Sequence, residues 1–344
     1  LWKHLHSVAG EMKAWVLQKQ AAIETRPLLL QEFPIPQVGE SEIRVKVHAC
    51  GVCRTDLHVA EGDLPLRKSP VVLGHQIVGV VDRVGEGVAK FKVGDGAGIA
   101  WLNSACGNCW FCRSGRENLC PEAKFTGWDT DGGYAEYVTV SQDFAFRLGK
   151  TLSFVEAAPL MCPGITGYRA LKLTEAKRGD KLGLYGFGPA ASYVLQVAKY
   201  LGIETYAITR SQKNKDWATR LGVDWVGGYE DKMPTKFDAA IVFPPAGNLV
   251  ELALSQLDSG GKLVLAAVYM TPIEVKNYNH LWMERSVKST ANITRDDGRE
   301  FLEIAAKIGI KTEVEVFPFD KLPEALILAK GGKVKGNPVI KVAD

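Results

Sequence analysis

One stretch, residues 181–201, restricts the fold of this chain more than any other. The short apolar run Lys181–Tyr185 leads into a glycine-rich turn over 186–190, and a helical pattern of apolar residues follows over 191–201. A strand, a glycine turn and a helix in this order are typical of a dinucleotide-binding βαβ unit. Later apolar runs predict further strands of a parallel sheet with right-handed helical crossovers, at 205–208, 238–243 and 262–268.

The chain before this stretch has a different pattern. Residues 42–48 alternate strictly between apolar and polar side chains, as a half-buried strand does. Residues 154–173 have the spacing of one helix, which contains Cys162 and Thr166. Because 344 residues exceed one ordinary hydrophobic core, we expect two domains, a β-rich one followed by an α/β one.

Composition and charge argue against several classes of protein. The formal net charge of +3 is too small to indicate a nucleic-acid or membrane-surface partner. No run approaches the roughly 18 apolar residues that a membrane span needs. The first residues have no signal-peptide pattern, so we expect a cytoplasmic protein. In that compartment the seven cysteines indicate metal binding or catalysis rather than disulfides.

Four of these cysteines stand close together. Their spacing, C-x2-C-x2-C-x7-C, brings four thiolates within reach of one metal ion. Disulfides between cysteines this close in the chain are strained, and the last gap is too long for a ferredoxin-type iron–sulfur site. We therefore predict a structural zinc in a lobe over 101–125, held by Cys106, Cys109, Cys112 and Cys120.

A second group of candidate residues centres on the segment 53–58. Cys53, Thr55 and His58 supply a thiolate, a hydroxyl and an imidazole, which a metal-assisted proton relay needs. A polar turn without a relay is the alternative. His75 and Cys162 strengthen the first interpretation, because two thiolates and one imidazole leave one position of a tetrahedral zinc open, as in catalytic sites.

These motifs together resemble those of the zinc-dependent medium-chain alcohol dehydrogenases. The resemblance begins at Met12 and covers nearly the full chain, in the family's order and approximate spacing. It is carried by five stretches: 51–58, Gly74-His75, the 106–120 lobe, Cys162 and the turn at Gly186.

The resemblance implies a fold and a domain arrangement. A GroES-like β-rich catalytic domain would be split by a Rossmann domain, a doubly wound parallel sheet of the α/β class. We therefore expect the catalytic domain at 12–157 and again at 297–344, the NADP-binding domain at 158–296, and a leader or cloning remnant at 1–11.

The resemblance also implies roles for the site residues. The three predicted ligands would bind the catalytic zinc, giving two zinc ions per chain with the structural one. Thr55 would take the proton of the alcohol, and His58 would pass it to solvent through the cofactor ribose. Asp56 resembles the carboxylate that orients the ligand histidine. The implied reaction is reversible hydride transfer between a primary alcohol or aldehyde and a nicotinamide cofactor.

The end of the second predicted strand indicates which nicotinamide is used. An NAD-preferring site has Asp or Glu there, whereas this chain has the neutral Thr209 followed by Arg210. A neutral residue followed by an arginine favours binding of a 2′-phosphate. We therefore predict NADP(H) as the cofactor, with NAD as the alternative. The predicted cofactor residues are Arg54, Thr166, Gly186, Gly188, Pro189, Ala190, Thr209, Arg210, Ser211, Lys215 and Val268.

Two residues depart from the family's pattern. Gln76 stands where the family usually has a glutamate beside the ligand histidine. Pro189 replaces a glycine that is common in the phosphate turn, and a proline has no N–H to donate to a phosphate. Proline is nevertheless well tolerated at the first position of a helix.

The pocket and the assembly are inferred from the resemblance as well. Trp101 resembles the tryptophan that narrows the pocket of yeast-type relatives, and Leu64 stands where those relatives have a second one. We therefore expect primary alcohols and aldehydes somewhat larger than ethanol as substrates. The family forms dimers or tetramers through an edge of the cofactor domain, and residues 262–268 are the predicted edge.

Three other functions share the fold. A polyol or sugar dehydrogenase is the nearest alternative. A zinc-free quinone or enoyl reductase would lack the predicted ligands. A non-catalytic NADP-binding protein would bind about one zinc per chain, the structural one, instead of about two.

Overall fold

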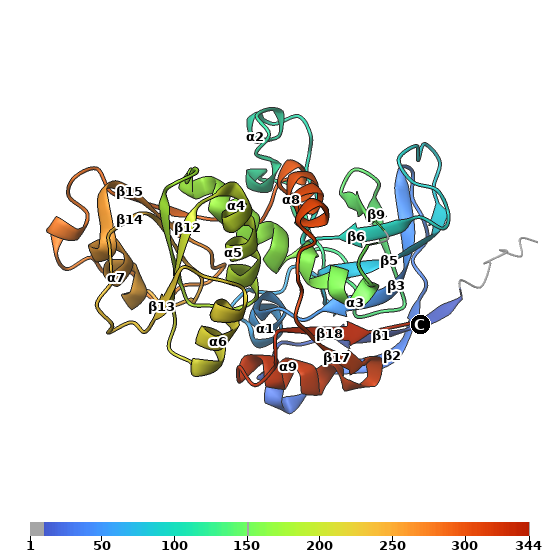
Figure 1. Cartoon of the computed structure of the whole chain (residues 1–344). Helices are drawn as coiled ribbons and strands as arrows, with labels where there is room; N and C mark the ends of the chain where they lie inside the picture. Colours follow the sequence, from blue (N-terminus) through green and yellow to red (C-terminus); the bar gives the residue numbers. More distant parts are fainter. Residues whose placement is uncertain (1–9, 150, 344) are drawn as a thin grey trace, which may run out of the picture. The chain divides into compact units, whose positions relative to one another are not determined.

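The structure, a computed structural model, describes residues 10–149 and 151–343 (Figure 1). Its elements form two compact units. The first unit runs to Met161 and resumes at Thr312, and the second unit is Cys162–Lys311.

The first unit is β-rich. Within the described residues its largest sheet has seven strands, in the order β10-β6-β5-β3-β18-β17 with β9 also paired to β3. A smaller sheet has the order β2-β1-β4, and β7 pairs with β8. The strands are β1 (Glu11–Leu17), β2 (Leu28–Pro34), β3 (Glu42–Gly51), β4 (Val71–Val72), β5 (Gln76–Val84), β6 (Gly96–Ile99), β7 (Leu102–Ser104), β8 (Lys124–Phe125), β9 (Tyr137–Ser141), β10 (Ala145–Arg147), β17 (Val314–Pro318) and β18 (Asn337–Lys341).

The helices of this unit are short and connect the strands. They are α1 (Arg54–Glu61), α2 (Trp110–Arg113), α3 (Phe154–Ala157) and α9 (Leu322–Lys330), with 3-10 turns η1 (Ile23–Thr25), η2 (Glu117–Leu119), η3 (Ala158–Met161) and η5 (Phe319–Lys321). The alternation predicted for 42–48 appears in β3, where Val45, Val47 and Ala49 are fully buried. The antiparallel pairing of β18 with β3 ties the end of the chain to the middle of this sheet.

The second unit contains a six-stranded parallel sheet in the order β13-β12-β11-β14-β15-β16. The chain starts in the middle, adds strands on one side and then switches to the other, as doubly wound dinucleotide-binding folds do. The strands are β11 (Lys181–Tyr185), β12 (Glu204–Ile208), β13 (Trp225–Gly227), β14 (Phe237–Val242), β15 (Leu257–Leu265) and β16 (Ser286–Ser289). The helices are α4 (Pro163–Thr174), α5 (Pro189–Leu201), α6 (Gln212–Arg220), α7 (Asn248–Gln256) and α8 (Arg295–Ile308), with a 3-10 turn η4 (Tyr278–His280).

The central strands of this sheet are apolar because helices cover both faces of a doubly wound sheet. Residues 239–242 of β14 are all buried, and α5 buries the predicted apolar positions Val194, Leu195 and Val197. The strand, turn and helix predicted over 181–201 are therefore present, and the α/β class with a Rossmann-type sheet is confirmed.

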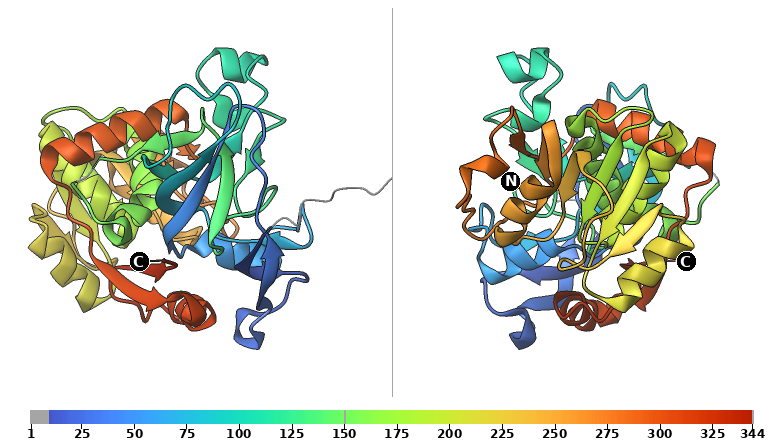
Figure 2. Two further views of the ribbon diagram at one scale, coloured as in Figure 1. Left: turned by 90° about the vertical axis from the view of Figure 1, so that its right-hand side faces the viewer. Right: turned by 60° about the vertical axis from the view of Figure 1, so that its left-hand side comes forward.

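The division between the units differs from the predicted domain boundaries. The first cut falls after Met161 rather than after 157, and the return begins at Thr312 rather than at 297. The later return has a packing reason, because α8 lies alongside α4 and α5 in the second unit (Figures 1 and 2). Of the predicted leader, Gly10 accepts a hydrogen bond from the Ile35 N–H and Glu11 lies opposite Pro34, the last residue of β2. Residues 1–9 lie outside the described residues.

The single helix predicted over 154–173 is wrong. The segment consists of α3, η3 and α4, and the helical backbone is interrupted at Cys162, whose φ and ψ are −130° and −74°. Pro163 occupies the first position of α4, and the ring of a proline disfavours helical geometry at the residue before it. The interruption puts Cys162 at the N-cap of α4 rather than inside a helix.

The predicted edge of the sheet is wrong too. β15, which contains most of 262–268, lies between β14 and β16, so it is an internal strand. The edge is β16, whose four residues are all exposed. β16 has one apolar residue among its four and was not predicted from the sequence, so only the pairing shows that a further strand lies outside β15.

A buried carboxylate joins α8 to α4. Asp297 accepts hydrogen bonds from Arg169 Nη1 at 2.6 Å and from the Thr294 backbone N–H at 2.9 Å, and its side chain is 2% exposed. Burial raises the pKa of Asp297, but these partners outweigh burial and hold its pKa below the usual range. The carboxylate therefore stabilises the fold in its charged form.

We expect Asp297→Ala to lower the free energy of unfolding by about 3–5 kcal/mol, because it leaves the Arg169 guanidinium without its buried partner. The contribution of Asp297 is present above the pKa of about 3.9 of an unfolded aspartate and is lost as the pH falls through the lower folded value. Urea denaturation measures the change. Asp296→Ala, at a side chain that is 67% exposed, is the control and should cost less than about 0.5 kcal/mol. Equal effects of the two substitutions would contradict this assignment.

Candidate metal and cofactor sites

Three side chains with metal-binding atoms converge in the described part of the chain. Cys53 stands two residues after the end of β3 and directly before α1, His75 directly precedes β5, and Cys162 lies between η3 and α4. Their two sulfurs and one ring nitrogen lie within 4.8 Å of one another. The set predicted from distant parts of the sequence is thus brought to one point.

Asp56 organises this group. Cys53 is the N-cap of α1 and Asp56 its third residue, so the Cys53 backbone N–H donates to Asp56 Oδ2 at 2.8 Å and caps the helix. The other oxygen, Oδ1, lies 3.0 Å from His75 Nδ1. The hydroxyl of Tyr134 donates to Oδ2 at 2.9 Å. One buried carboxylate therefore begins the helix and also orients the histidine.

His75 is oriented as a metal ligand would be. Its Nδ1 faces Asp56, and its Nε2 is buried with no hydrogen bond of ordinary geometry to any described residue, although the Cys53 thiol lies close. Burial lowers the pKa of His75, but Asp56 and Cys53 outweigh burial and raise this pKa to about 10. A buried nitrogen without a partner, beside two thiols, is the donor set that zinc prefers, so the residues fit a zinc ion.

The two predicted relay residues lie on the same helix. Thr55 is buried, and its Oγ1 lies 3.7 Å from Cys53 Sγ. His58 is one turn further along α1, and its Nδ1 lies 2.7 Å from Asp63 Oδ2. A carboxylate on Nδ1 favours the tautomer in which Nε2 is the acceptor. Asp63 therefore orients His58 in the way that Asp56 orients His75.

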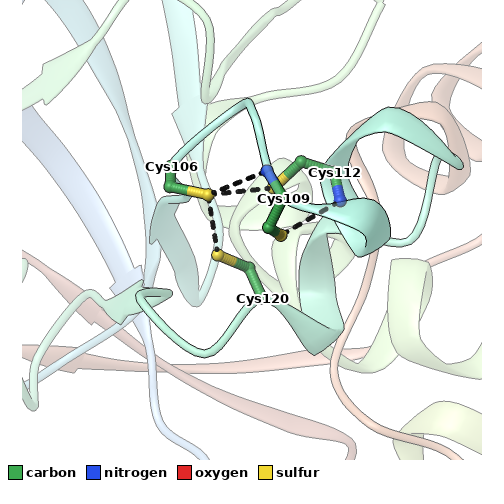
Figure 3. A group of neighbouring side chains, drawn as sticks. All are labelled: Cys106, Cys109, Cys112 and Cys120. Carbon is green, nitrogen blue, oxygen red and sulfur yellow. Dashed lines mark hydrogen bonds between the residues drawn. The ribbon is translucent and has the colours of Figure 1, made fainter.

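The four clustered cysteines also converge (Figure 3). The Cys106 sulfur lies 3.5 Å from that of Cys120 and 3.9 Å from that of Cys112. Zinc–sulfur bonds of about 2.3 Å in a tetrahedron place the sulfurs about 3.8 Å apart, so the cluster has the dimensions of a closed zinc site. Backbone N–H groups point at the sulfurs, and the one from Cys112 lowers the pKa of Cys109 to about 7. The thiolate form of Cys109, which a metal needs, is thereby favoured, whereas burial raises the pKa of Cys112 to about 12.

Aromatic rings form a wall beside His75. The Trp101 ring centroid lies 6.0 Å from that of His75, 4.7 Å from Phe125 and 5.8 Å from Trp128. Leu64 is half-buried, and its backbone N–H donates to the carbonyl of His58. Of the two predicted pocket residues, Trp101 is therefore in contact range of a predicted ligand. Phe125 and Trp128 belong to the same wall, and sequence reasoning did not identify them.

The glycine-rich turn lies at the carboxyl end of β11, where the strand order switches. Gly186 has φ +79°, and a Cβ at this position would stand 2.5 Å from the Pro244 ring, so only glycine fits. Gly188 is the N-cap of α5 and Pro189 its first residue. No described atom lies within 4 Å of the position of a Cβ at Gly188, so the N-terminus of this long helix is open. The turn fits a phosphate group of a dinucleotide.

The end of β12 holds the residues predicted for the 2′-phosphate. Thr209 is buried and its backbone N–H donates to Gly227, whereas Arg210 is exposed. Ser211 is the N-cap of α6, where its Oγ accepts from the Asn214 N–H and keeps its own hydrogen to donate. Lys215 lies on the first turns of α6 with its ammonium 3.9 Å from Asp231.

The remaining predicted cofactor residues lie elsewhere. Arg54 is exposed at the first position of α1 in the first unit. Thr166 is half-buried in α4, where its backbone N–H donates to the carbonyl of Cys162. Val268 follows β15 and is 45% exposed.

Comparisons with known proteins agree with this geometry. Two family models match the chain, the alcohol dehydrogenase GroES-like domain over residues 39–150 and the zinc-binding dehydrogenase over 189–307. A probable alcohol dehydrogenase AdhA of Mycobacterium tuberculosis is 43% identical, and the match covers 98% of this chain and 99% of the relative. The chain belongs to the zinc-dependent medium-chain alcohol dehydrogenase family.

Solved structures support the same family. A cinnamyl alcohol dehydrogenase of Sorghum bicolor has a TM-score of 0.88 and 29% identity, with 96% of this chain and 98% of that chain covered. An acetophenone reductase of Geotrichum candidum, solved in complex with NAD, has a TM-score of 0.88 and 25% identity, with 98% of each chain covered. The family membership makes this chain an oxidoreductase of alcohols that uses zinc and a nicotinamide cofactor.

Three residues of this alcohol dehydrogenase were not predicted from its sequence. Tyr134 donates to Asp56, Asp63 binds His58, and Asp231 lies beside Lys215. Asp63 directly follows Gly62, the C-cap of α1. A carboxylate just after the glycine that ends the helix of His58 is a local signal that could have indicated this partner. Tyr134 lies 78 positions from Asp56, and Asp231 lies 16 positions from Lys215. No local sequence pattern links the members of either pair.

Every helix in the described ranges 10–149 and 151–343 is too short or too polar to cross a lipid bilayer.

Proposed function

We propose that this dehydrogenase catalyses reversible hydride transfer between primary alcohols or aldehydes and NADP(H). The observation that carries the proposal is the group of Cys53, His75 and Cys162, with a buried ring nitrogen that has no other partner. The first unit would be the catalytic domain and the second the cofactor-binding domain.

Two zinc ions per chain are part of the proposal. Cys53, His75 and Cys162 would hold the catalytic ion and the four clustered cysteines the structural one. A bound zinc acts as a Lewis acid that makes an alcohol proton easier to remove and a carbonyl more electrophilic. Asp56 keeps the imidazole of His75 in place and raises the basicity of its other ring nitrogen, which makes that nitrogen a stronger ligand for zinc.

Proton movement is assigned to Thr55 and His58. Thr55 Oγ1, buried beside Cys53, would accept the proton of the alcohol. His58 would release it to water, and Asp63 would stabilise the charged imidazole during the transfer. The hydride itself passes between the alcohol carbon and the nicotinamide, and this chemistry belongs to the cofactor.

The choice of NADP(H) rests on the end of β12. No acidic side chain follows this strand directly, and the exposed Arg210 stands over the Tyr229 ring at 5.9 Å, where it could meet a 2′-phosphate. Thr209 and Ser211 supply hydroxyls, and Lys215 supplies a second positive charge. Charged donors of this kind bind phosphate more strongly than a ribose hydroxyl.

Kinetics with the two cofactors test this choice. We expect kcat/KM for NADPH to exceed that for NADH by about tenfold or more, and Arg210→Ala to reduce the NADPH value by about tenfold while leaving NADH within about twofold, because only the 2′-phosphate loses a charged partner. Arg220→Ala, at the last residue of α6 and outside the predicted set, is the control. A preference of the unmodified protein for NADH would overturn the NADP(H) proposal.

The substrate class is proposed from the aromatic wall. Trp101 offers an apolar ring beside the predicted zinc ligand His75, and Phe125 and Trp128 pack against Trp101. Such a wall suits the apolar tail of a primary alcohol or aldehyde larger than ethanol better than it suits a polyol, whose hydroxyls would have no partners there. A panel of straight-chain and aromatic aldehydes with NADPH, run beside sugars and polyols with NADP, separates these substrate classes.

We also propose a homo-oligomer, formed through β16. No described strand pairs with the outer edge of β16, and the segment 268–287 exposes large apolar side chains. An unpaired edge strand with exposed apolar side chains beside it is a pairing surface. The exposed side chains are Val268, Tyr269, Ile273, Val275, Tyr278, Trp282, Met283 and Val287.

A charge on this edge should break the oligomer. We expect Val287→Glu to convert it to monomers in size-exclusion chromatography with light scattering, because two like charges would face each other across the paired edges. Val93→Glu is the matched control, since Val93 is 60% exposed in the first unit. A monomeric unmodified protein, or an oligomer that persists in Val287→Glu, would exclude this interface.

A further inference from the structure

The ends of β12 and β13 lie side by side, and this brings a carboxylate to the proposed 2′-phosphate position. The two strands are parallel with Ile208 opposite Gly227, and the Thr209 backbone N–H donates to the Gly227 carbonyl at 2.8 Å. The residues after each strand therefore share one edge of the sheet. On one side stands Arg210, and on the other the loop 228–231.

Asp231 is held in this loop by the backbone. Its Oδ2 accepts a hydrogen bond from the Gly228 N–H at 2.6 Å. A Cβ at Gly227 would stand 2.9 Å from the same oxygen, so the glycine leaves the space that the carboxylate occupies. The negative charge is thus kept at the carboxyl end of β13 although the side chain is 54% exposed.

The carboxylate faces the positive charges that would bind a phosphate. The Lys215 ammonium lies 3.9 Å from Asp231 Oδ2, and it would lie 3.6 Å from a Cβ at Gly228. The Arg210 guanidinium lies 5.9 Å from the ring centroid of Tyr229, which belongs to the same loop. One of the two cations proposed for the 2′-phosphate is therefore partly neutralised by an acidic neighbour.

We infer that Asp231 determines how strongly this protein discriminates between the phosphorylated and the unphosphorylated cofactor. The inference rests on the proposed cofactor function of this edge. A carboxylate repels a 2′-phosphate and competes with it for Lys215, and a carboxylate can accept hydrogen bonds from ribose hydroxyls. Asp231 thus weakens the preference for NADP(H) that Arg210 and Lys215 create. It supplies, from the neighbouring strand, the carboxylate that an NAD-preferring site has at the position of Thr209.

Binding of two cofactor fragments tests the inference without catalysis or zinc. Adenosine 2′,5′-bisphosphate and AMP differ by the 2′-phosphate alone, and isothermal titration calorimetry gives both dissociation constants. We expect Asp231→Asn to bind the bisphosphate about three- to fivefold more tightly, the range of an exposed ion pair, and AMP equally or more weakly. Asparagine keeps an oxygen that can accept from the Gly228 N–H, so the loop is retained.

Two further variants make the test specific. Glu230→Gln removes the same charge from the neighbouring exposed residue, which has no ion pair with Lys215 among the described residues, and it should change neither constant by more than about twofold. In a Lys215→Ala background most of the gain from Asp231→Asn should disappear.

The outcomes separate the inference from the function on which it rests. A bisphosphate affinity that does not rise in Asp231→Asn, or rises equally in Glu230→Gln, overturns the role of Asp231. A wild-type protein that binds AMP better than the bisphosphate overturns the NADP(H) proposal. If Asp231→Asn then binds the bisphosphate more tightly than the wild type does, the result still supports Asp231 as the residue that disfavours the 2′-phosphate.

Discussion

Cys162→Ser is expected to lower kcat/KM for alcohol oxidation by a factor on the order of a thousand or more. The hydroxyl of a serine is a poor zinc ligand at neutral pH, and Cys162 is one of only two sulfurs in the predicted catalytic set. The loss should appear in kcat as well as in kcat/KM, because the electrophile itself is lost rather than a binding contact. Steady-state kinetics in both directions measure it.

Cys50→Ala is the matched control for this variant. Cys50 is a buried cysteine three positions before Cys53, but it is not a member of either metal-binding group. We expect it to retain activity within about twofold, at a modest cost in stability. Equal loss of activity in the two variants would mean that cysteine burial, rather than zinc ligation, supports the reaction.

Cys112→Ser is expected to destabilise the first unit rather than to abolish the chemistry directly. No residue of α2 is buried, so hydrophobic packing does not hold this helix and we expect it to depend on the metal for order. Loss of a structural zinc removes a binding free energy of about 10 kcal/mol or more from the lobe. We expect an unfolding midpoint lower by about 10 °C or more and faster proteolysis between 105 and 120.

Arg113→Ala is the control within the same lobe. Arg113 is exposed at the end of α2 and offers no metal-binding atom. Its midpoint and its proteolysis should match those of the unmodified protein. An unchanged midpoint in Cys112→Ser would mean that the four sulfurs do not hold a stabilising ion.

The sequence indicates which cysteine and histidine side chains converge because ligand chemistry is carried by few residue types at characteristic spacings. The four clustered cysteines are close in the chain, and the distant ligand set Cys53, His75 and Cys162 follows from the family resemblance. The parallel sheet is also predictable, because its buried strands and its glycine turn have local patterns.

Most of the features that were not predicted depend on contacts between distant segments, and the break at Cys162 is the exception. The break at Cys162 follows from Pro163, a local signal, but the helical spacing on both sides of it concealed the break. The outer position of β16 is a property of strand order, which the pattern of a strand does not contain. The carboxylate of Asp231 reaches the end of β12 only because two parallel strands end together, so the neutral Thr209 alone gives an incomplete account of the cofactor site.

The zinc content of the purified protein, measured by mass spectrometry of the metal against protein concentration, tests the central claim most directly. We expect about two zinc ions per chain in the unmodified protein and about one in each of Cys162→Ser and Cys112→Ser. One ion per chain in the unmodified protein, or two that persist when Cys162 is replaced, would contradict a catalytic zinc held by Cys53, His75 and Cys162.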